Sequence, residues 1–297
     1  MIEEKEMPLV SVVIISYNQG NFLEDSLKSV LSQTYKNIDI LIIDNNSSDN
    51  ESSLLSKNIS EKYGINFLKR KDRILTKALN EALNIVDGKY LCFIAADDIM
   101  INNRIELQVN YLETSESNIA ACFGNQIKIN DYGQLIGISK IMKEKIIDFK
   151  EVFTSRVNLY APTSMYKVKA LKHIGGFDIN HKVEDLSIYL KLTNNNYKLL
   201  RIENPLSLYR IHSNNTHTKY MWMMKEQLKI WNDYKENYLY KKGIENIYLE
   251  HFSNFGSKNK IECIKLIPKI FHRIDSKYWW FGFIRLFFDF RSINKKK

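Results

Sequence analysis

The chain has 297 residues, 44% of them hydrophobic, which is enough for one large α/β domain with an addition or for two small domains. Its three cysteines, Cys92, Cys122 and Cys263, form no CxxC pair and disfavour a disulfide framework. The acidic N-terminus lacks the apolar core of a secretory signal, and no run approaches the roughly 20 apolar residues that span a bilayer. We therefore expect a cytoplasmic protein.

The net charge of +9 is distributed unevenly along the chain. Residues 1–218 carry 26 basic and 26 acidic side chains, whereas residues 219–297 carry 17 basic and 8 acidic ones. The whole positive excess thus lies in the last quarter of the chain. It predicts an anionic partner for that segment, either a membrane surface or nucleic acid.

The first 125 residues alternate between strand and helix patterns. β-branched residues predict a strand over Val10–Ser16, and apolar side chains at helical spacing follow over residues 22–31. The further elements expected here are strands at 38–43, 65–68 and 90–96 and helices at 54–63 and 75–86. Such alternation predicts an α/β fold with a mostly parallel sheet and right-handed crossovers.

The later part of the chain is less regular. Residues 126–218 mix the two patterns, with a Gly-Gly-Phe-Asp turn at 175–178 and a helix expected from Asp185 to Asn194. From Tyr220 onward the pattern is helical and rich in aromatic residues and lysines. The sheet is therefore expected to end before this segment.

Two adjacent carboxylates, Asp97 and Asp98, follow the apolar run 90–96, which is typical of a strand buried on both faces. Neighbouring negative charges resist burial unless a cation compensates them, and hard divalent cations prefer carboxylate and phosphate oxygens. In open α/β sheets, ligands bind at the carboxyl ends of the strands. The pair thus indicates a cation site, although Asp98 as the N-cap of a helix over residues 103–114 explains it equally well.

Polar residues also follow the first two strands. Ser16, Tyr17 and Asn18 lie in a loop whose single glycine is too few for a dinucleotide-binding fingerprint, which disfavours a Rossmann dehydrogenase. Asp44 ends the second strand, where a carboxylate can accept a hydrogen bond from a base or a ribose, or simply close an Asx-turn. Because parallel strands end at one sheet edge, Tyr17, Asp44 and Asp97 are expected to form a nucleotide site with a divalent ion on the diphosphate.

In these motifs the chain resembles family 2 glycosyltransferases of the GT-A fold. These are inverting enzymes that use nucleotide-sugar donors and commonly build bacterial surface polysaccharides. The resemblance spans about residues 8–215 and rests on segments in family-like order: Val10–Asn18, Ser29–Tyr35, Ile42–Asp49, Ala78–Asp98, Gly175–Asp178, Glu184–Asp185 and Tyr209–His212. It implies a GT-A domain over 1–218, with a nucleotide-binding half of about 8–125 and an acceptor half of about 126–218. A helical extension over 219–297 follows.

The resemblance implies that the nucleotide sugar is bound by a set of strand-end and loop residues: Ser16, Tyr17, Asn18, Asp44, Arg73, Lys77 and Asp98. Tyr17 and Asp44 would contact the nucleobase, and either Arg73 or Lys77 would reach the base or the diphosphate.

The resemblance also implies a metal site. Asp97 matches the final carboxylate of the family's DXD motif, the ligand of a divalent cation, Mn²⁺ or Mg²⁺. The first position of that motif is Ala95, so the motif is degenerate, and Asp98 would take part of the missing role. His212 is expected to be a second metal ligand or a contact of the diphosphate.

Glu184 and Asp185 match the family's acceptor-side pair. Inverting transfer needs a base within hydrogen-bond reach of the acceptor hydroxyl. The resemblance implies that Asp185 is this catalytic base and that Glu184 orients the acceptor. The pair also suits the first turn of a helix beginning near Leu186, because acidic side chains favour a helix N-terminus. Both roles can hold together.

The aromatic segment Tyr278–Phe290 lies outside the resemblance. At about fifteen residues it is too short to span a bilayer but suited to lie in a membrane interface, with the terminal lysines attracting anionic lipid. We expect residues 275–297 to contact a membrane surface. The alternative is a terminal helix that packs on the catalytic domain or on a sister subunit of a homo-oligomer. The apolar density disfavours nucleic acid as the partner.

The sequence therefore predicts an inverting, metal-dependent glycosyltransferase at the inner face of the cytoplasmic membrane. It would move a sugar from a nucleotide-diphospho-sugar donor to a glycan acceptor, expected to be lipid-linked, during synthesis of an O-antigen- or capsule-like surface polysaccharide. The alternative is a non-catalytic nucleotide-sugar-binding or scaffold subunit, which Ala95 alone supports.

Overall fold

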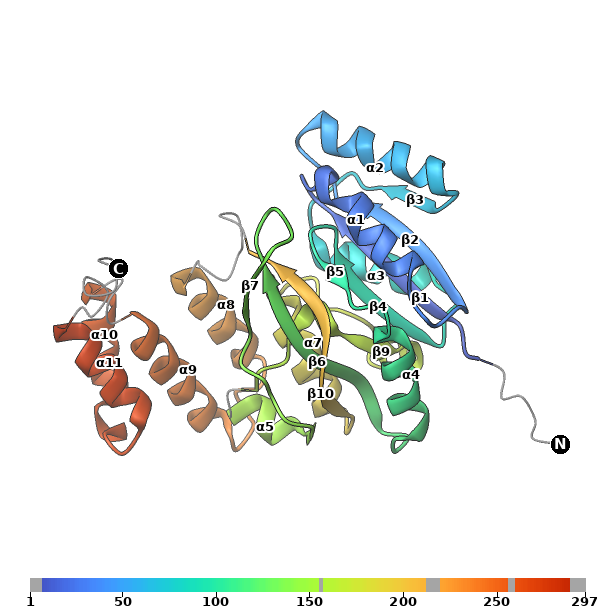
Figure 1. The fold of residues 1–297 in the computed structure, drawn as a ribbon. Coiled ribbons are helices and arrows are strands. Elements are labelled where there is room, and N and C mark those ends of the chain that lie inside the picture. The colour runs from blue at the N-terminus through green and yellow to red at the C-terminus, as the bar shows by residue number, and fades with distance from the viewer. Residues whose placement is uncertain (1–6, 155–156, 212–219, 256–259, 289–297) are drawn as a thin grey trace. The chain divides into compact units, whose positions relative to one another are not determined.

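The computed structural model describes residues 7–154, 157–211, 220–255 and 260–288 (Figure 1). The chain divides into two compact units. The first comprises Met1–Phe149 and Val157–Ser213, and the second comprises Lys150–Arg156 and Asn214–Lys297. All the described residues of the predicted nucleotide and acceptor sites belong to the first unit.

Four parallel strands form the N-terminal half of the sheet in the first unit, in the order β3-β2-β1-β4. The strands are β1 (Val10–Ser16), β2 (Ile38–Asp44), β3 (Asn66–Lys69) and β4 (Tyr90–Ala95). The crossover helices are α1 (Gly20–Leu31), α2 (Asn50–Tyr63) and α3 (Leu75–Ile85). The predicted alternation is confirmed here, because each apolar run is a strand and each amphipathic stripe a helix.

The rest of the sheet is mixed. From β4 it continues in the order β9-β6-β10-β5, and β6 runs parallel to β10. In addition, β7 pairs with β6, and β8 pairs with β10. β9 runs antiparallel to β4 and β6, and β5 antiparallel to β10. The strands are β5 (Ile99–Met100), β6 (Ile119–Ile129), β7 (Leu135–Ile138), β8 (Lys145–Ile147), β9 (Met165–Lys167) and β10 (Lys198–Arg210). The helices are α4 (Arg104–Thr114), α5 (Phe149–Thr154), the 3₁₀ turn Ala161–Thr163, α6 (Val168–His173) and α7 (Glu184–Asn194).

One predicted helix cap is wrong. α4 has Asn103 at its N-cap, and the short strand β5 separates Asp98 from that helix. Asp98 cannot cap α4, because its side chain accepts a hydrogen bond from the far strand β10. The carboxylate pair therefore keeps a role at the end of β4.

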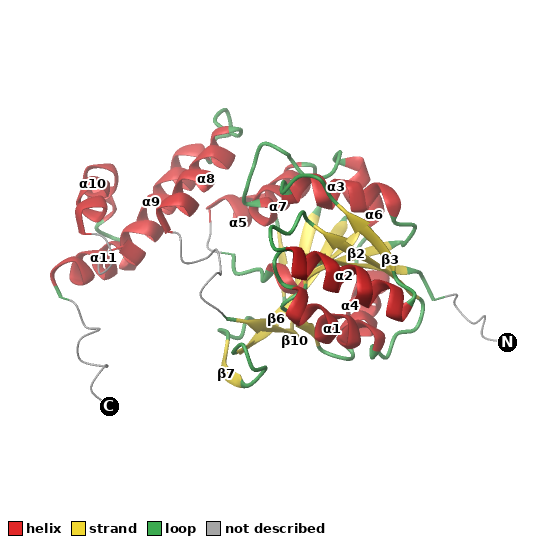
Figure 2. Cartoon of the chain, turned by 90° about the horizontal axis from the view of Figure 1, so that it is seen from above, coloured by secondary structure: helices red, strands yellow, loops and turns green. Residues whose placement is uncertain are grey.

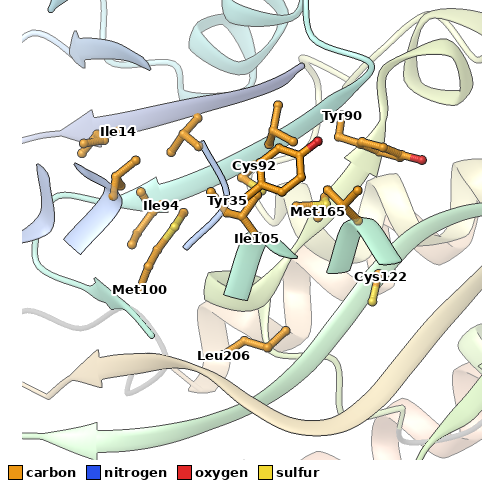
Figure 3. Close-up of a cluster of buried hydrophobic side chains, with 14 of the residues drawn as sticks. Ile14, Tyr35, Tyr90, Cys92, Ile94, Met100, Ile105, Cys122, Met165 and Leu206 are labelled. Carbon is orange, nitrogen blue, oxygen red and sulfur yellow. The ribbon is translucent and has the colours of Figure 1, made fainter. Parts of the chain in front are cut away.

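Helices cover both faces of the sheet. In Figure 2, α1, α2 and α4 lie on one side of the strands, and α3 and α6 lie on the other. The core on the first side includes Ile14, Tyr90 and Cys92 from the strands, and Ile105 from α4 (Figure 3). This three-layer packing buries β1 and β4 and leaves their carboxyl ends, where the polar residues follow, at the sheet edge.

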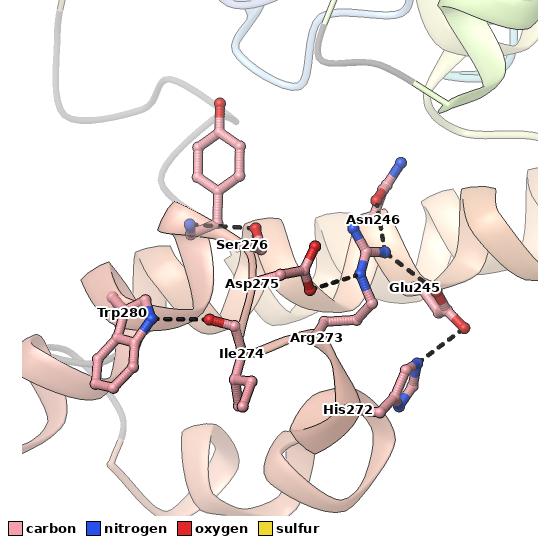
Figure 4. Close-up of polar contacts among 9 residues, drawn as sticks. Glu245, Asn246, His272, Arg273, Ile274, Asp275, Ser276 and Trp280 are labelled. Carbon is pink, nitrogen blue, oxygen red and sulfur yellow. Dashed lines mark hydrogen bonds and ion pairs between the residues drawn. The ribbon is translucent and has the colours of Figure 1, made fainter.

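Over its described residues the second unit contains most of α5, the 3₁₀ turn Phe271–Arg273 and the helices α8 (Tyr220–Asn232), α9 (Tyr240–Phe255), α10 (Lys260–Ile270) and α11 (Lys277–Phe287). Figure 4 shows Glu245 of α9 holding both His272 and Arg273, each at 3.1 Å. The indole N–H of Trp280 donates to Ile274 O at 2.8 Å, which fixes the start of α11. The predicted helical character of this region is confirmed.

α11 uses its two faces differently. Gly282 packs against the ring of Phe252, where a Cβ would collide, and Arg285 donates to Ser253 O at 2.7 Å. The other face exposes Trp280, Phe281 and Phe287. Among the described residues, no helix combines the length and the apolar character needed to cross a bilayer.

Candidate functional site

The carboxyl ends of β1, β2 and β4 meet at one edge of the sheet. Ser16 pairs in register with Asp44, and Ile15 pairs with Ala95. The alignment continues past the strands, because Asn45 N–H donates to Ser16 O at 2.8 Å. The structure thus brings the loops that carry Tyr17, Asp44 and Asp97 to the same edge.

Asp44 is fully buried at this edge and offers one carboxylate oxygen to a ligand. Its Oδ1 accepts from the backbone N–H and the hydroxyl of Ser47, at 3.0 and 2.6 Å. Its Oδ2 is buried with no hydrogen-bond partner among the described residues. A buried acceptor without a donor is costly, and the N–H of a nucleobase or the hydroxyl of a ribose would satisfy it. One oxygen therefore closes the turn, and the other is suited to a nucleoside.

Tyr17 and Arg73 lie together beside the loop that follows Asp44. The Tyr17 ring is 37% exposed, and the guanidinium carbon of Arg73 lies 5.4 Å from its centroid. Lys77 is exposed on the first turn of α3. Of the two cations that the sequence left open, the structure thus places Arg73 at the Tyr17 ring.

Asn18 joins the loop after β1 to the loop after β2. It adopts a left-handed φ of 54°, its Oδ1 accepts from Ser48 N–H at 2.8 Å, and its Nδ2 donates to Ser48 Oγ at 2.8 Å. Its side chain is therefore occupied in holding the two loops together. Its contribution to a nucleotide would be to fix the position of Tyr17.

Arg210, at the end of β10, holds the segment that carries Asp97 and Asp98. Its Nε donates to Asp97 O at 2.8 Å, and its backbone N–H donates to Asp98 Oδ1 at 3.0 Å. Its Nη1 donates to Asn130 O and Asp131 O, at 3.0 and 2.9 Å. One buried arginine thus fixes the end of β4 against the turn that follows β6.

Asp98 lies in a low-dielectric environment. Burial and the charge of Asp97 raise its pKa well above the ordinary range, while the Arg210 N–H and the nearby Arg104 oppose that shift. Arg104 is fully buried and donates to Pro162 O at 2.6 Å and Ser164 O at 2.9 Å. Asp98 is therefore part of the scaffold of the site.

The donor set at this edge fits a divalent cation. Asp97 supplies a hard carboxylate oxygen, Asp98 Oδ1 is held by Arg210, and Ala95 supplies no ligand. Mg²⁺ is commonly bound by one or two carboxylates together with substrate phosphates. Asp97 with a diphosphate would meet that requirement. His212, the predicted second ligand, lies outside the described residues.

Glu184 and Asp185 open α7 as a partly buried acidic pair. α7 begins at Glu184 and holds both acidic residues in its first turn, which confirms the predicted helix-start position. Asp185 Oδ1 also accepts from Leu186 N–H at 2.7 Å. Burial, then the charge of Asp185, raises the pKa of Glu184 to about 8, and burial raises the pKa of Asp185. Such a pair is suited to take up a proton near neutral pH.

Two buried tyrosines, Tyr166 and Tyr189, interact electrostatically with this pair. Burial raises the pKa of the Tyr166 and Tyr189 phenols, and the charges of the pair raise it further, so both rings lie near the pair. Tyr166 packs against Phe93 of β4 at 6.4 Å and against Phe123 at 5.9 Å between ring centroids. The same cluster thus connects the acidic pair with β4, the strand that precedes Asp97.

The Gly-Gly-Phe-Asp turn is clamped by Asn80 of α3. Asn80 Oδ1 accepts from Phe177 N–H at 2.7 Å, and its Nδ2 donates to Phe177 O at 2.8 Å. Gly175 and Gly176 both adopt left-handed φ angles, of 72° and 69°. A Cβ at Gly176 would collide with Asn80 Oδ1, whereas one at Gly175 would find only Lys191 Nζ, at 4.0 Å.

This difference predicts unequal effects of two matched substitutions on stability. G175A should lower the free energy of unfolding by about 1 kcal/mol, because alanine pays only for the left-handed backbone. G176A should lower it by about 3 kcal/mol, because the Asn80 clamp is also broken. Urea unfolding of the two variants measures the difference. Equal losses would show that the clamp does not stabilise the turn.

Three buried arginines that support the site were not among the predicted site residues. Arg70 pairs with Glu81 and, at 3.0 Å, with Asp72, and so holds the loop that carries Arg73. Arg104 falls in the apolar stripe of its helix, four residues before the buried Gln108, and this spacing is a signal that could have found it. Arg70 lies in a basic run, and nothing in that run distinguishes it. Arg210 lies in a segment of the resemblance, but no spacing reveals its partners.

Comparison with known proteins decides the family. The model of the family described as "Glycosyl transferase family 2" matches residues 11–175. The chain belongs to this family. It is therefore a glycosyltransferase, and the predicted family and activity class are confirmed.

Two relatives of this glycosyltransferase extend the match beyond the family model. It is 30% identical over 214 residues to an uncharacterized glycosyltransferase of Methanocaldococcus jannaschii, covering 71% of this chain and 73% of the relative. It is 28% identical over 241 residues to the Escherichia coli enzyme WfgD, described as a UDP-Glc:alpha-D-GlcNAc-diphosphoundecaprenol beta-1,3-glucosyltransferase, covering 77% of this chain and 87% of that one.

Solved structures show that the glycosyltransferase has the GT-A fold. Staphylococcus aureus TarS 1–349 in complex with UDP superposes with a TM-score of 0.64 at 16% identity, over 94% of this chain and 87% of that one. The mannosyltransferase PcManGT from Pyrobaculum calidifontis, in complex with GDP-Man and Mn²⁺, gives 0.62 at 13% identity, over 95% and 85%. The predicted fold class is confirmed.

Proposed function

We propose that this glycosyltransferase moves a sugar, with inversion, from a nucleotide-diphospho-sugar to a lipid-linked glycan in the synthesis of a bacterial surface polysaccharide. The observation that carries the proposal is the shared sheet edge, where the unsatisfied Asp44 Oδ2 and the Asp97 segment follow β2 and β4, the two strands that flank β1. The lipid-diphosphate acceptor named for WfgD supports the choice of acceptor.

On the donor side, each residue has a physical role. Asp44 Oδ2 would accept a hydrogen bond from the base or the ribose, and the exposed Tyr17 ring, backed by Arg73, would stack on the base. Asp97 would hold the divalent cation. When bound, that cation supplies Lewis-acid stabilisation of the departing diphosphate. Arg210 keeps Asp97 in place through the backbone.

On the acceptor side, Asp185 would take the proton from the attacking hydroxyl. A carboxylate serves as such a base when its pKa is raised towards the working pH, and burial does this for Asp185. The bond from Leu186 N–H to Oδ1 fixes the orientation of the carboxylate. Glu184 would orient the acceptor. The bond between C1 of the sugar and the diphosphate oxygen breaks as the acceptor oxygen bonds to C1 from the opposite face. This gives inversion.

The donor half of the proposal is tested by ligand-induced stabilisation. One of UDP-, GDP- or dTDP-sugar, with Mn²⁺, should raise Tm, because a ligand at about a hundredfold excess over its Kd adds about 2.7 kcal/mol to native-state stability. D44N is the matched control, since its Nδ2 presents a donor where the proposal needs an acceptor, and it should lose most of the shift. If no nucleotide sugar raises Tm, the proposal fails.

The same experiment separates the enzyme from the scaffold alternative. The bound donor should be turned over slowly to nucleoside diphosphate and free sugar, and EDTA should stop this hydrolysis. Binding without any metal-dependent turnover would favour the non-catalytic subunit.

The second unit supports a peripheral membrane location for residues 275–297. Over the described part of this range, Trp280, Phe281 and Phe287 are 49%, 49% and 62% exposed on one face of α11. The opposite face packs on α9 of the same unit, which is neither the catalytic domain nor a sister subunit. An amphipathic aromatic face with basic residues suits the headgroup region of a membrane. We propose this face as one contact with the inner face of the cytoplasmic membrane.

A further inference from the structure

A hairpin projects from the catalytic unit next to the metal-binding segment. β7 pairs antiparallel with the end of β6 through Ile127–Ile138 and Lys128–Gly137 (Figures 1 and 2). The turn between them is well formed, because Asn130 Oδ1 accepts from Tyr132 N–H at 3.0 Å and from Gln134 N–H at 2.9 Å. Gly133 supplies the left-handed φ of 76° that the turn requires. The hairpin is thus an ordered element of the first unit.

The hairpin exposes apolar side chains on both faces of its outer strand. Successive strand residues point to opposite faces, yet Leu135, Ile136 and Ile138 are 71%, 51% and 65% exposed. Tyr132 at the turn is 88% exposed, and Ile141, just past the strand, is 59% exposed. Among the described residues, β7 pairs with β6 alone. Single exposed apolar residues are normal, but five of them within residues 132–141 mark an interaction surface.

Charge indicates the chemistry of the partner. Residues 128–146 carry four lysines and two acidic residues, and Lys140, Lys143 and Lys145 are exposed directly after the apolar strand. A protruding apolar tip with an interfacial tyrosine and flanking lysines matches a bilayer with anionic headgroups. A second copy of the chain is a poorer partner, because its own lysines would then lie against these lysines and the like charges would repel.

Arg210 connects this hairpin to the active-site edge. It donates to the carbonyls of Asn130 and Asp131 at the base of the turn, and also to Asp97 O. The side chain of Arg210 alone therefore links the hairpin turn to Asp97, the proposed metal ligand. A membrane-seated tip would hold this sheet edge at headgroup level, where the diphosphate of a lipid-linked acceptor lies.

We propose that the β6–β7 hairpin, residues 130–141, is a membrane-docking element that seats the catalytic edge on an anionic bilayer and so selects a lipid-linked acceptor. This inference deepens the proposed function and rests on it for the identity of the acceptor. It is separate from the α11 contact, because the hairpin belongs to the first unit.

Docking can be read out without any assay of activity. Cys92, Cys122 and Cys263 are all buried, so a polarity-sensitive fluorophore will label an introduced I136C in the full chain. Its emission should shift to the blue on adding phosphatidylglycerol vesicles, and nitroxide-labelled acyl chains should quench it. L54C on α2, 60% exposed in the wild type, is the matched control and should not respond. No response at position 136, or a vesicle-independent shift that grows with protein concentration, would overturn the proposal, the latter in favour of self-association.

Activity then distinguishes failure of this inference from failure of the proposed function. The variant L135S/I136S/I138S should lower transfer to a lipid-linked acceptor in vesicles by about tenfold or more. Its metal-dependent hydrolysis of the donor in solution should stay within about twofold of wild type, because the changed residues lie outside the donor site. Unchanged transfer in vesicles would refute the docking role, whereas wild-type protein without any donor hydrolysis would refute the enzyme itself.

Discussion

Replacing Asp97 with asparagine is expected to lower kcat/KM for sugar transfer by about 10³-fold, because one charged group that acts on the departing diphosphate is lost. Asparagine keeps the size of the side chain and one oxygen but removes the negative charge that a divalent cation needs. No carboxylate at position 95 compensates. The remaining family-like carboxylate, Asp98, is held by the backbone N–H of Arg210.

The fold should survive this substitution. Asp97 adds to the unfavourable charge around the buried Asp98, so neutralising it removes a repulsion and should leave the free energy of unfolding unchanged or higher. Transfer kinetics over a Mn²⁺ titration, together with urea unfolding, measure both effects. D98N is the matched control, because its amide oxygen can still accept from Arg210 N–H, and it should keep far more activity than D97N. Full activity of D97N at every Mn²⁺ concentration would contradict the assignment.

The donor edge was predictable because the sequence signals there are local. The apolar runs before Ser16, Asp44 and Asp97 are strands, and polar residues that follow parallel strands must meet at one sheet edge. The resemblance added roles that spacing alone could not assign. The α11 segment was predictable for a similar reason, since its aromatic pattern has a helical period.

Features that depend on long-range contacts were not predictable. The side chain and backbone of Arg210 link segments about 80 and 110 residues away, and no local pattern reveals such a link. The helix-cap alternative for Asp98 stayed open in the sequence because β5 has only two residues, Ile99 and Met100, too few for a periodic signal. The hairpin around β7 was missed because the mixed pattern of residues 126–218 gave no strand period.

Replacing Asp185 with asparagine is expected to lower kcat/KM by about 10²- to 10⁴-fold, the usual contribution of a positioned base. Asparagine cannot take up the proton of the acceptor hydroxyl, yet its amide oxygen can still accept from Leu186 N–H, so α7 should keep its first turn. Donor binding, measured by the shift in Tm with nucleotide sugar, should remain. Loss of donor binding together with activity would instead indicate a structural role.

The pH profile gives a second, independent test of the same pair. Burial raises the pKa of both carboxyls, and the charge of Asp185 raises that of Glu184 further, to about 8, so Asp185 ionises first, while Glu184 is still neutral. Wild-type kcat/KM should therefore rise with pH through a limb well above the ordinary carboxyl range of about 4. E184Q should leave this limb in place, because Glu184 is still neutral when Asp185 ionises, and kcat/KM at high pH should stay within about tenfold of wild type. A limb that disappears in E184Q, or that persists in the residual activity of D185N, would assign the titrating group to a residue other than Asp185.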